Sequence, residues 1–437
     1  MMILTLPARQ SGARLRRTSV LAATLATLFW VALPASAAPR VPTDPAEVLE
    51  RLPIRPGDAR AREIATLRAA VRAAPDDPAA AVKLGDYWYD LAMAKGDPRF
   101  IGYAEALMTP HFNHPTRSQL PAVQTLRGQL RQYRHDFDGA MADFSAVIQA
   151  HPDFAQARAW RGAIQLVQGR YTEAMADCEA LRTIGGAQGN DTLTAGCMGL
   201  AQAYGGKLAA AQATLERSLA RATDPGNRLW LHARLGEVMQ WRGDLKAAEK
   251  HYRAALALNI EDSFLLISWS EFLLDQKRYD EVVKFLAGWE NSDALLLRLA
   301  LAESALKLPT AAAHIQALRD RFAAARARGD TTHQVDESRF ELQLNNNPAR
   351  ALELAIANFQ DQKEPRDART LLEAAIASGN AAAAQPARDW LAASGFEDPL
   401  TRKLGTDSAN AGSAATPGAA PGLPAPPNAP AKPGSQP

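Results

Sequence analysis

A short break with one shared pattern recurs through the middle of this 437-residue chain. It reads Gly-Arg-Tyr-Thr-Glu-Ala from Gly169, Gly-Lys-Leu-Ala-Ala-Ala from Gly206 and Gly-Asp-Leu-Lys-Ala-Ala from Gly243. Looser versions end at Ala140 and Val282, so the last residues of the five segments lie 34, 37, 37 and 34 residues apart. A period near 34 residues is typical of proteins built from repeated pairs of helices.

The stretches between these breaks predict helices. Apolar residues recur there at helical spacing, and no strand-like alternation of apolar and polar residues interrupts them. Hydrophobic residues make up 47% of the chain and charged residues 22%, which is the balance of an ordinary folded protein. We therefore expect an all-α helical repeat array over residues 58–400, with its clearest repeats over 121–290.

The spacing of small and large residues inside each unit resembles the tetratricopeptide repeat family. The unit at 121–154 has the family's small, large and turn residues in order: Gly128, Ala140, Phe144, Val147 and Pro152. The unit at 229–262 repeats the pattern with Gly236, Ala248, Tyr252 and Ala255. This resemblance implies a right-handed superhelical solenoid of antiparallel helix hairpins, in which each unit packs on its neighbours.

Some units depart from the pattern. The first small position, which lets two helices approach closely, holds Ser270 in the unit at 263 and Arg339 in the unit at 332. The resemblance is weak over 294–400, as expected for the terminal repeats of an array.

The first residues predict a cleavable secretory signal. Arg14, Arg16 and Arg17 precede the uncharged, mostly apolar stretch 20–33, and small residues then lead to a cleavage site after Ala37. A retained membrane anchor is the alternative, but the apolar run is shorter than the roughly 20 residues of a spanning helix. We expect a signal peptide over 1–37, a Pro-rich leader over 38–57 and a periplasmic protein without a transmembrane segment in the mature chain.

The end of the chain has a different composition. Residues 405–437 consist largely of Ala, Pro, Gly and Ser, and this composition predicts a disordered tail because it cannot form a packed core. Without residues 1–37 the formal net charge changes from +2 to −2 because four arginines are lost, so nothing in the charge favours nucleic acid as a partner.

The chain has two cysteines, Cys178 and Cys197, in neighbouring repeats. In an oxidising compartment they can form a disulfide that joins adjacent units. Two buried thiols acting as small hydrophobic side chains are an equally good interpretation, because sequence does not give the distance between them.

No recognised catalytic or nucleotide-binding motif occurs in the sequence, and the repeats occupy nearly all of the foldable length. We therefore predict no catalytic residue, no cofactor and no metal site. His111 and His114 are three residues apart, but no cysteine or acid lies within a few residues, so they are interpreted as solvated loop histidines.

The resemblance places the ligand surface on the inner face, which the first helix of each unit lines. On that basis the candidate partner-binding residues are Trp230, Glu237, Gln240, Trp241, Phe264 and Glu271. Aromatic rings beside carboxylates suit a protein or peptide with apolar and basic side chains. In the alternative interpretation, Trp230 and Trp241 only pack between helices.

The sequence thus predicts a non-catalytic protein–protein interaction scaffold or adaptor in the bacterial cell envelope, which binds a partner in the concave groove. Two alternatives stay open. The chain could be a self-associating structural envelope protein, or an accessory subunit of an exopolysaccharide, pilus or outer-membrane assembly machine.

Overall fold

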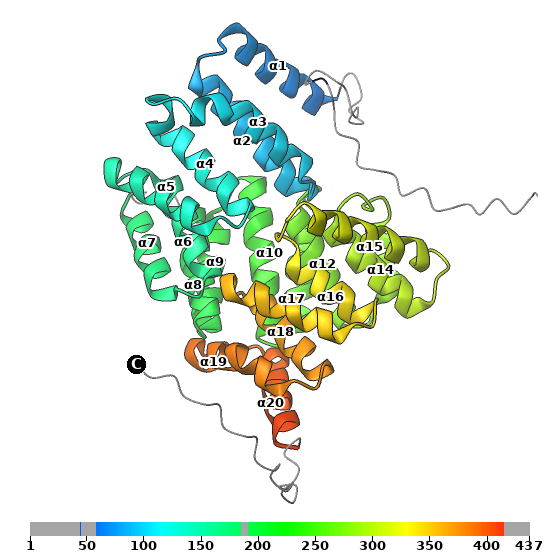
Figure 1. The fold of residues 1–437 in the computed structure, drawn as a ribbon. Helices are drawn as coiled ribbons and strands as arrows, with labels where there is room; N and C mark the ends of the chain where they lie inside the picture. The colour runs from blue at the N-terminus through cyan, green and yellow to red at the C-terminus, as the bar shows by residue number, and fades with distance from the viewer. Residues whose placement is uncertain (1–43, 45–57, 185–190, 415–437) are drawn as a thin grey trace, which may run out of the picture. The chain divides into compact units, whose positions relative to one another are not determined.

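The structure, a computed structural model, describes Asp44, residues 58–184 and residues 191–414 (Figure 1). The chain divides after residue 61, and the fold described below is that of the second unit, residues 62–437. The predicted signal peptide 1–37 lies outside the described residues, as do nearly all of the leader 38–57 and the segment 415–437.

The described residues form helices and no strands. The α-helices are α1 Ala59–Ala73, α2 Pro78–Lys95, α3 Arg99–Phe112, α4 Pro121–Tyr133, α5 Phe137–Ala150, α6 Ala155–Val167, α7 Tyr171–Ile184, α8 Asp191–Tyr204, α9 Leu208–Arg221, α10 Pro225–Trp241, α11 Leu245–Leu256, α12 Ser263–Asp275, α13 Tyr279–Leu286, α14 Asp293–Leu306, α15 Ala311–Ala327, α16 Gln334–Gln343, α17 Pro348–Asp361, α18 Pro365–Ala377, α19 Gln385–Ser394 and α20 Pro399–Ala414. Two short 3₁₀ helices are η1 Arg117–Gln119 and η2 Ala381–Ala384. In this part of the chain, no helix is long and apolar enough to cross a membrane.

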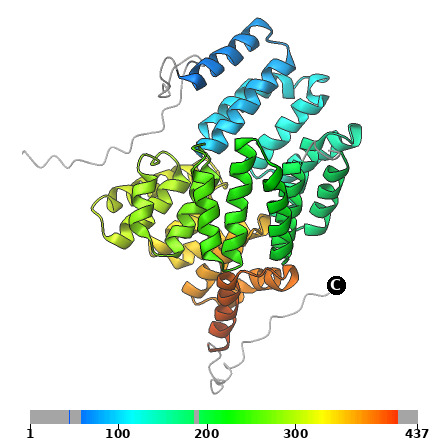
Figure 2. The same cartoon turned by 180° about the vertical axis from the view of Figure 1, so that it is seen from behind.

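Consecutive helices pair as hairpins from α2–α3 to α16–α17, and each hairpin packs against the next (Figures 1 and 2). The predicted all-α solenoid of stacked helix hairpins is therefore confirmed. A hairpin of this kind cannot bury its apolar face alone, so stability comes from the interfaces between neighbours.

The recurring sequence breaks share one backbone conformation. Gly169, Gly206 and Gly243 have φ angles of 74°, 71° and 77°, and His135 and Lys277 take the equivalent positions with φ of 60° and 57°. This left-handed conformation ends a helix, and glycine adopts it without the steric cost that a Cβ brings. The spacing found in the sequence is thus the spacing of the turns between paired helices.

Glycine also permits the close approach of paired helices that the resemblance implied. A Cβ on Gly128 would lie 2.6 Å from the ring of Phe144, and one on Gly236 would lie 2.6 Å from the ring of Tyr252. Both rings are fully buried. In each case the large residue of the second helix fills the space that the missing side chain leaves on the first helix.

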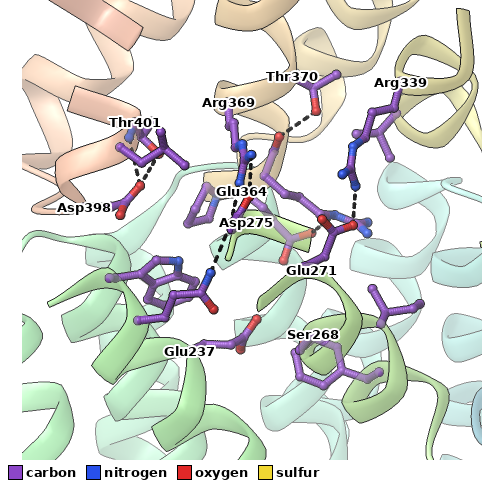
Figure 3. A pocket seen from close by; sticks show the side chains of 18 of the residues that line it. Glu237, Ser268, Glu271, Asp275, Arg339, Glu364, Arg369, Thr370, Asp398 and Thr401 are labelled. Carbon is purple, nitrogen blue, oxygen red and sulfur yellow. Dashed lines mark hydrogen bonds and ion pairs between the residues drawn. The ribbon is translucent and has the colours of Figure 1, made fainter. Parts of the chain in front are cut away.

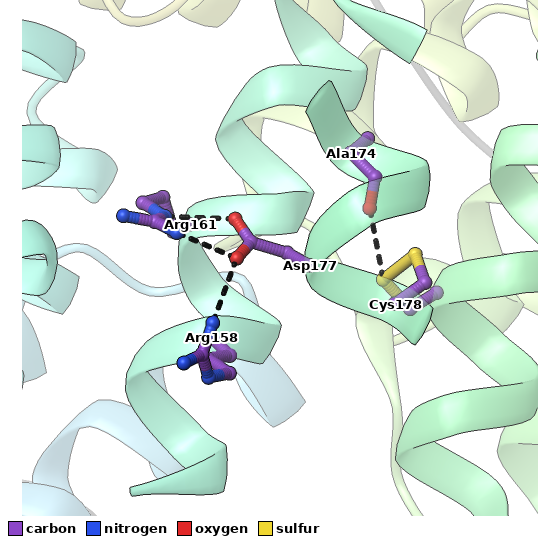
Figure 4. Close-up of a disulfide and its surroundings, with 6 residues drawn as sticks. Arg158, Arg161, Ala174, Asp177 and Cys178 are labelled. Carbon is purple, nitrogen blue, oxygen red and sulfur yellow. Dashed lines mark hydrogen bonds and ion pairs between the residues drawn. A yellow bond between two sulfur atoms is a disulfide. The ribbon is translucent and has the colours of Figure 1, made fainter. Parts of the chain in front are cut away.

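In the unit at 155–188 a disulfide takes the place of that large ring. Cys178 on α7 and Cys197 on α8 are bonded, and a Cβ on Gly162 would lie 3.1 Å from the Cys197 sulfur (Figure 4). Beside the disulfide, the buried carboxylate of Asp177 accepts hydrogen bonds of 2.6 and 2.7 Å from Arg161. The sequence left open a disulfide or two buried thiols, and the structure has the disulfide, which joins adjacent units.

Helices α2 and α12 are far apart in the sequence but contact each other in the fold. Lys95, the last residue of α2, forms a 2.6 Å ion pair with Glu261. The hydroxyl of Ser263 donates a hydrogen bond to the carbonyl of Met93. The end of α2 therefore contacts the start of α12, across about 170 residues of sequence.

The C-terminal helices fold back onto the middle repeats. The backbone N–H of Lys363 donates to the carbonyl of Val167 at 2.6 Å. The indole N–H of Trp390 donates to the hydroxyl of Tyr171 at 2.7 Å. These contacts bring α19 and the start of α18 against the repeats that contain α6 and α7, and Glu397, just before α20, accepts a hydrogen bond from the first residue of α9.

The expected start of the disordered tail at residue 405 is wrong. Helix α20 continues to Ala414, ten residues into the segment assigned to the tail. Asp398 begins the helix by accepting the backbone N–H of Thr401 at 2.8 Å, and the buried hydroxyl of Ser408 accepts a 3.1 Å hydrogen bond from Arg388. Tertiary contacts thus stabilise a segment whose composition alone does not favour helix.

Candidate functional site

One cavity of about 300 Å³ lies where the C-terminal helices meet the inner faces of α10 and α12 (Figure 3). Its lining includes five of the six predicted partner-binding residues: Glu237, Gln240, Trp241, Phe264 and Glu271. The charged residues around it are Arg234, Glu237, Glu271, Asp275, Arg298, Asp336, Arg339, Glu364, Arg366, Arg369, Glu373 and Asp398. The residue pattern of the repeats therefore located the surface on which the cavity forms.

Helical spacing brings these side chains to one side of each helix. On α12 the lining residues Phe264, Glu271 and Asp275 follow one another at intervals of seven and four residues. On α18 the lining residues Arg366, Arg369 and Glu373 follow one another at intervals of three and four residues. Residues at such spacing share one face of a helix, so each helix contributes a stripe of polar side chains.

An arginine cluster surrounds Glu271 on α12. The Nε of Arg298 lies 2.7 Å from the Glu271 carboxylate as an ion pair, without the alignment of a hydrogen bond, and Arg339 forms a second ion pair with it. Burial by itself raises the pKa of Glu271, but the charges of Arg339 and Arg298 outweigh burial and hold that pKa near 2. Glu271 is thus a fixed anion whose charge is already compensated.

Arg339 explains one departure from the repeat pattern. It stands on α16 where the repeat resemblance calls for a small residue, and its guanidinium points toward Glu271 (Figure 3). A side chain that breaks the packing pattern here contributes to the cavity wall. The unexpected arginine at this position was the one sequence signal for this part of the site.

A second group of charges lies at the centre of the cavity. Arg369 donates hydrogen bonds of 2.8 and 2.9 Å to the two carboxylate oxygens of Asp275 and one of 2.8 Å to Glu373. Gln240 donates to Asp275 at 3.3 Å. Burial lowers the pKa of Arg369, but the bonds to Asp275 and Glu373 raise it above its ordinary value, so this guanidinium stays charged. One arginine here is shared by two carboxylates.

Arg234 and Glu237 form a third pair, on one face of α10. Their ion pair is 2.9 Å long, and the Arg234 guanidinium stacks 3.7 Å from the centre of the Phe264 ring. Burial raises the pKa of Glu237 even though Arg234 opposes that shift. The ring face of Phe264 is therefore already covered by a cation, and the Glu237 carboxylate is held in a poorly solvated place.

Trp230 does not line the cavity, so its predicted role in partner binding stays a prediction. It packs against α8, where a Cβ on Gly196 would lie 2.4 Å from its ring. Trp241 does line the cavity, but it also packs against two other rings. Its ring centre lies 5.4 Å from that of Phe396 and 5.9 Å from that of Tyr204. The two tryptophans therefore pack between helices, and Trp241 does so at the border of the cavity.

Arg366 has the longest ion pairs among the arginines of the lining. Its side chain is 52% exposed, and its nearest carboxylates lie 3.8 Å away on Glu364 and 3.9 Å away on Asp367. The partly buried surroundings lower the pKa of Arg366, but the charges of Glu364 and Asp367 outweigh this and raise that pKa above its ordinary value. The exposed fraction shows that the side chain reaches free space next to the other lining residues.

The sequence missed that the C-terminal helices form one wall of this cavity. α18 and the residues from Asp398 to Thr401 supply that wall, although the repeat pattern fades before them. No periodicity could have placed them, because the position of a fold-back segment depends on long-range packing. Trp390 and Phe396, two large apolar residues outside any clear repeat, were the available hint.

The two histidines that the sequence assigned to a solvated loop, His111 and His114, lie in different surroundings. His111 lies in α3 and is only 3% exposed, whereas His114 accepts the backbone N–H groups of Thr116 and Arg117 at 3.2 Å. Apolar packing of α3 draws His111 inward, so the expectation of a solvated side chain is wrong for this residue. Across the described residues, no group of three or more His, Cys, Asp or Glu side chains is placed to hold a metal ion.

A pair of histidines forms outside the cavity. The Nδ1 atoms of His232 on α10 and His251 on α11 lie 3.1 Å apart, with ring centres 5.3 Å apart. Both side chains are half-buried. The two residues are 19 apart in the sequence, and the α10–α11 hairpin brings their rings together with an angle of 44° between the ring planes.

Comparisons with known proteins give no family assignment. No protein family matches the chain, and no curated protein matches it. Among solved structures, the chain is similar to the crystal structure of the P58(IPK) TPR domain, with 15% sequence identity over 77% of this chain and 99% of that one. The TM-score is 0.22, which is too low to establish a common arrangement of the helices.

Proposed function

We propose that this chain is a non-catalytic scaffold that binds a protein partner in the cavity between α10, α12 and the C-terminal helices. The supporting observation is that five residues predicted from the repeat pattern line one cavity together. A volume of about 300 Å³ is at the lower end of the range for ligand sites. It suits one or two inserted side chains rather than a whole helix.

The charge of the lining favours a basic side chain. Seven carboxylates face five arginines around the cavity. Arg369 is shared by Asp275 and Glu373, and the Asp398 carboxylate has no arginine partner among its hydrogen bonds. An inserted lysine or arginine side chain would balance this excess, and the apolar side chains of Ile267 and Leu400 in the lining would contact its neighbours.

The proposed place of action is the bacterial cell envelope. The predicted signal peptide 1–37 with cleavage after Ala37 supports export. The disulfide between Cys178 and Cys197 supports an oxidising compartment, where such bonds persist. N-terminal sequencing of the protein from a periplasmic fraction tests this step: a mature chain that begins at Ala38 supports it, and an uncleaved chain in the cytoplasm contradicts it.

The binding proposal is tested with a pair of matched variants. Glu364→Gln with Glu373→Gln removes two negative charges from the cavity and keeps the shape and acceptor oxygen of each side chain. Glu179→Gln with Glu353→Gln removes the same charge from the outer surface, where the side chains are 49% and 69% exposed. Circular dichroism and thermal melting of both double variants would check that they are folded.

The baits are the mature chain 38–437 and its two double variants, each incubated with native envelope extract and analysed by mass spectrometry. We expect one partner that is retained by wild type and by the outer-surface variant and lost with the cavity variant. A synthetic peptide from that partner should then lose binding when its basic residue is replaced by alanine. Equal capture by all three baits would show that the cavity is not the binding site.

Self-association is an outcome of the same experiment. If wild type recovers only copies of this chain, light scattering over a concentration series would show whether it forms oligomers. That result would replace the adaptor proposal with the structural one. If the partner belongs to an exopolysaccharide, pilus or outer-membrane assembly machine, the scaffold is an accessory subunit of that machine.

A further inference from the structure

The paired histidines of the hairpin α10–α11 form a second candidate site, separate from the cavity. We propose that His232 and His251 bind a divalent transition-metal ion, with Cu²⁺ preferred over Zn²⁺. Neither histidine lines the cavity, so this site is independent of the proposed partner binding.

The distance between the two ring nitrogens fits a chelate. The Nδ1 atoms lie 3.1 Å apart, on two helices that belong to one hairpin. Metal–imidazole bonds are about 2.0–2.1 Å long, so one ion bonded to both nitrogens would have a nitrogen–metal–nitrogen angle of about 95–102°. That angle lies between the square-planar and tetrahedral values, so the pair needs little rearrangement to close on an ion.

The rigidity of the hairpin supports the site. Just after His251, Tyr252 is fully buried against Gly236, which fixes α11 against α10 close to the histidines. The two imidazoles are thereby held together before any ion binds. A ligand pair that is already in place loses little conformational entropy on binding, which favours chelation.

Glu216 on α9 is the acidic residue whose charge raises the pKa of His251. Its exposed side chain now accepts a 2.7 Å hydrogen bond from Gln212. Because the side chain is exposed, it can turn toward the histidines without unpacking the core. Two histidines, one carboxylate and water are a common ligand set for these ions.

Two cations near the pair limit the affinity. The charge of Arg228 lowers the pKa of His232, and the charge of Lys250 lowers the pKa of His251. Each of these positive charges would also repel a metal ion. Cu²⁺ forms the most stable complexes with nitrogen ligands among the divalent ions of the first transition series. It is therefore the ion that should overcome this repulsion first.

The test is titration of the tag-free mature chain with Cu²⁺ and, separately, with Zn²⁺ by isothermal calorimetry. Electron paramagnetic resonance of the one-equivalent Cu²⁺ complex then reports the nitrogen ligands. We expect one site whose affinity for Cu²⁺ falls roughly tenfold or more in His232→Ala and in His251→Ala, because each loses one ligand. Coupling to two imidazole nitrogens in wild type should become coupling to one in either variant.

The matched control is His151→Ala, which removes an exposed histidine from another repeat. It should leave the Cu²⁺ site unchanged. His251→Gln serves as a second variant, since it keeps a polar side chain in the hairpin if alanine weakens the fold. Unchanged Cu²⁺ affinity in the His232 and His251 variants, or a wild-type spectrum without two nitrogen ligands, would overturn the proposal. The pair would then be only a hydrogen bond between two neutral rings.

Discussion

The carboxylate of Glu397 accepts a hydrogen bond of 3.0 Å from the backbone N–H of Leu208, which lies 189 residues earlier in the chain. Leu208 is the first residue of α9, and the residue before it, Lys207, provides no side-chain cap. A carboxylate from the C-terminal segment therefore caps a helix of the middle repeats. It also lies where the negative charge interacts favourably with the start of the helix.

Replacing Glu397 with alanine should destabilise the protein through α9. We expect a loss of about 1 kcal/mol in the free energy of unfolding, since a helix N-terminus loses its cap and its favourable charge. Urea denaturation followed by circular dichroism measures this. Glu397→Gln should lose about half as much, because it keeps the acceptor and removes only the charge. Equal stability of wild type and the alanine variant would show that the cap contributes nothing.

Gly236→Ala should disturb the packing of the α10–α11 hairpin. The added Cβ would lie 2.6 Å from the buried ring of Tyr252, so the helices must move apart at a cost of about 1–3 kcal/mol. The control is Gly102→Ala in α3, where a Cβ meets nothing within 4 Å. In that variant we expect the free energy of unfolding to rise by up to about 1 kcal/mol, because alanine favours helix more than glycine does. Thermal melting of both variants gives the comparison.

Asp86 should make the stability of the fold depend on pH. Burial, together with the charge of Asp90, raises the pKa of Asp86 from 3.8 to about 6. The folded chain therefore binds this proton more tightly than the unfolded chain, and stability falls as pH rises from about 4 to about 6. Because the side chain is only half-buried, we expect a change of about 1–2 kcal/mol rather than the full value of the shift.

Asp86→Asn tests this assignment. The variant should be more stable than wild type at pH 7.5 and should lose most of that advantage at pH 4, where the wild-type carboxyl is protonated. Urea denaturation at the two pH values measures the difference. Asp153→Asn removes an exposed carboxylate and serves as the control. An advantage that is the same at both pH values would assign the effect to packing instead of ionisation.

Removal of the disulfide should weaken the junction between two repeats. The bond closes a loop between residues 19 apart, and its loss in Cys178→Ala with Cys197→Ala should cost about 3 kcal/mol. Chemical denaturation of wild type with and without a reducing agent should show a similar loss, whereas the variant should not respond to the reductant. A reductant effect on the variant would mean that the reductant does not act through this disulfide.

The sequence by itself determined the helical hairpins and the positions of the turns in the clearest repeats. Glycines such as Gly169 and Gly243 end helices through a local backbone preference, and Gly236 with Tyr252 specifies a contact inside one unit. These relations involve residues close in the chain, so their spacing alone is informative. For the same reason, the repeat pattern found the inner-face residues Glu237 and Glu271 of the candidate site.

Only the tertiary structure decided how the chain returns on itself. Asp275 and Arg369 are 94 residues apart and share two hydrogen bonds, and Trp241 meets Phe396 at the border of the cavity. Such contacts depend on the sum of small rotations between successive hairpins, which no single repeat encodes. The inner face could therefore be predicted from local spacing, whereas the cavity wall opposite it arises from packing between distant parts of the chain.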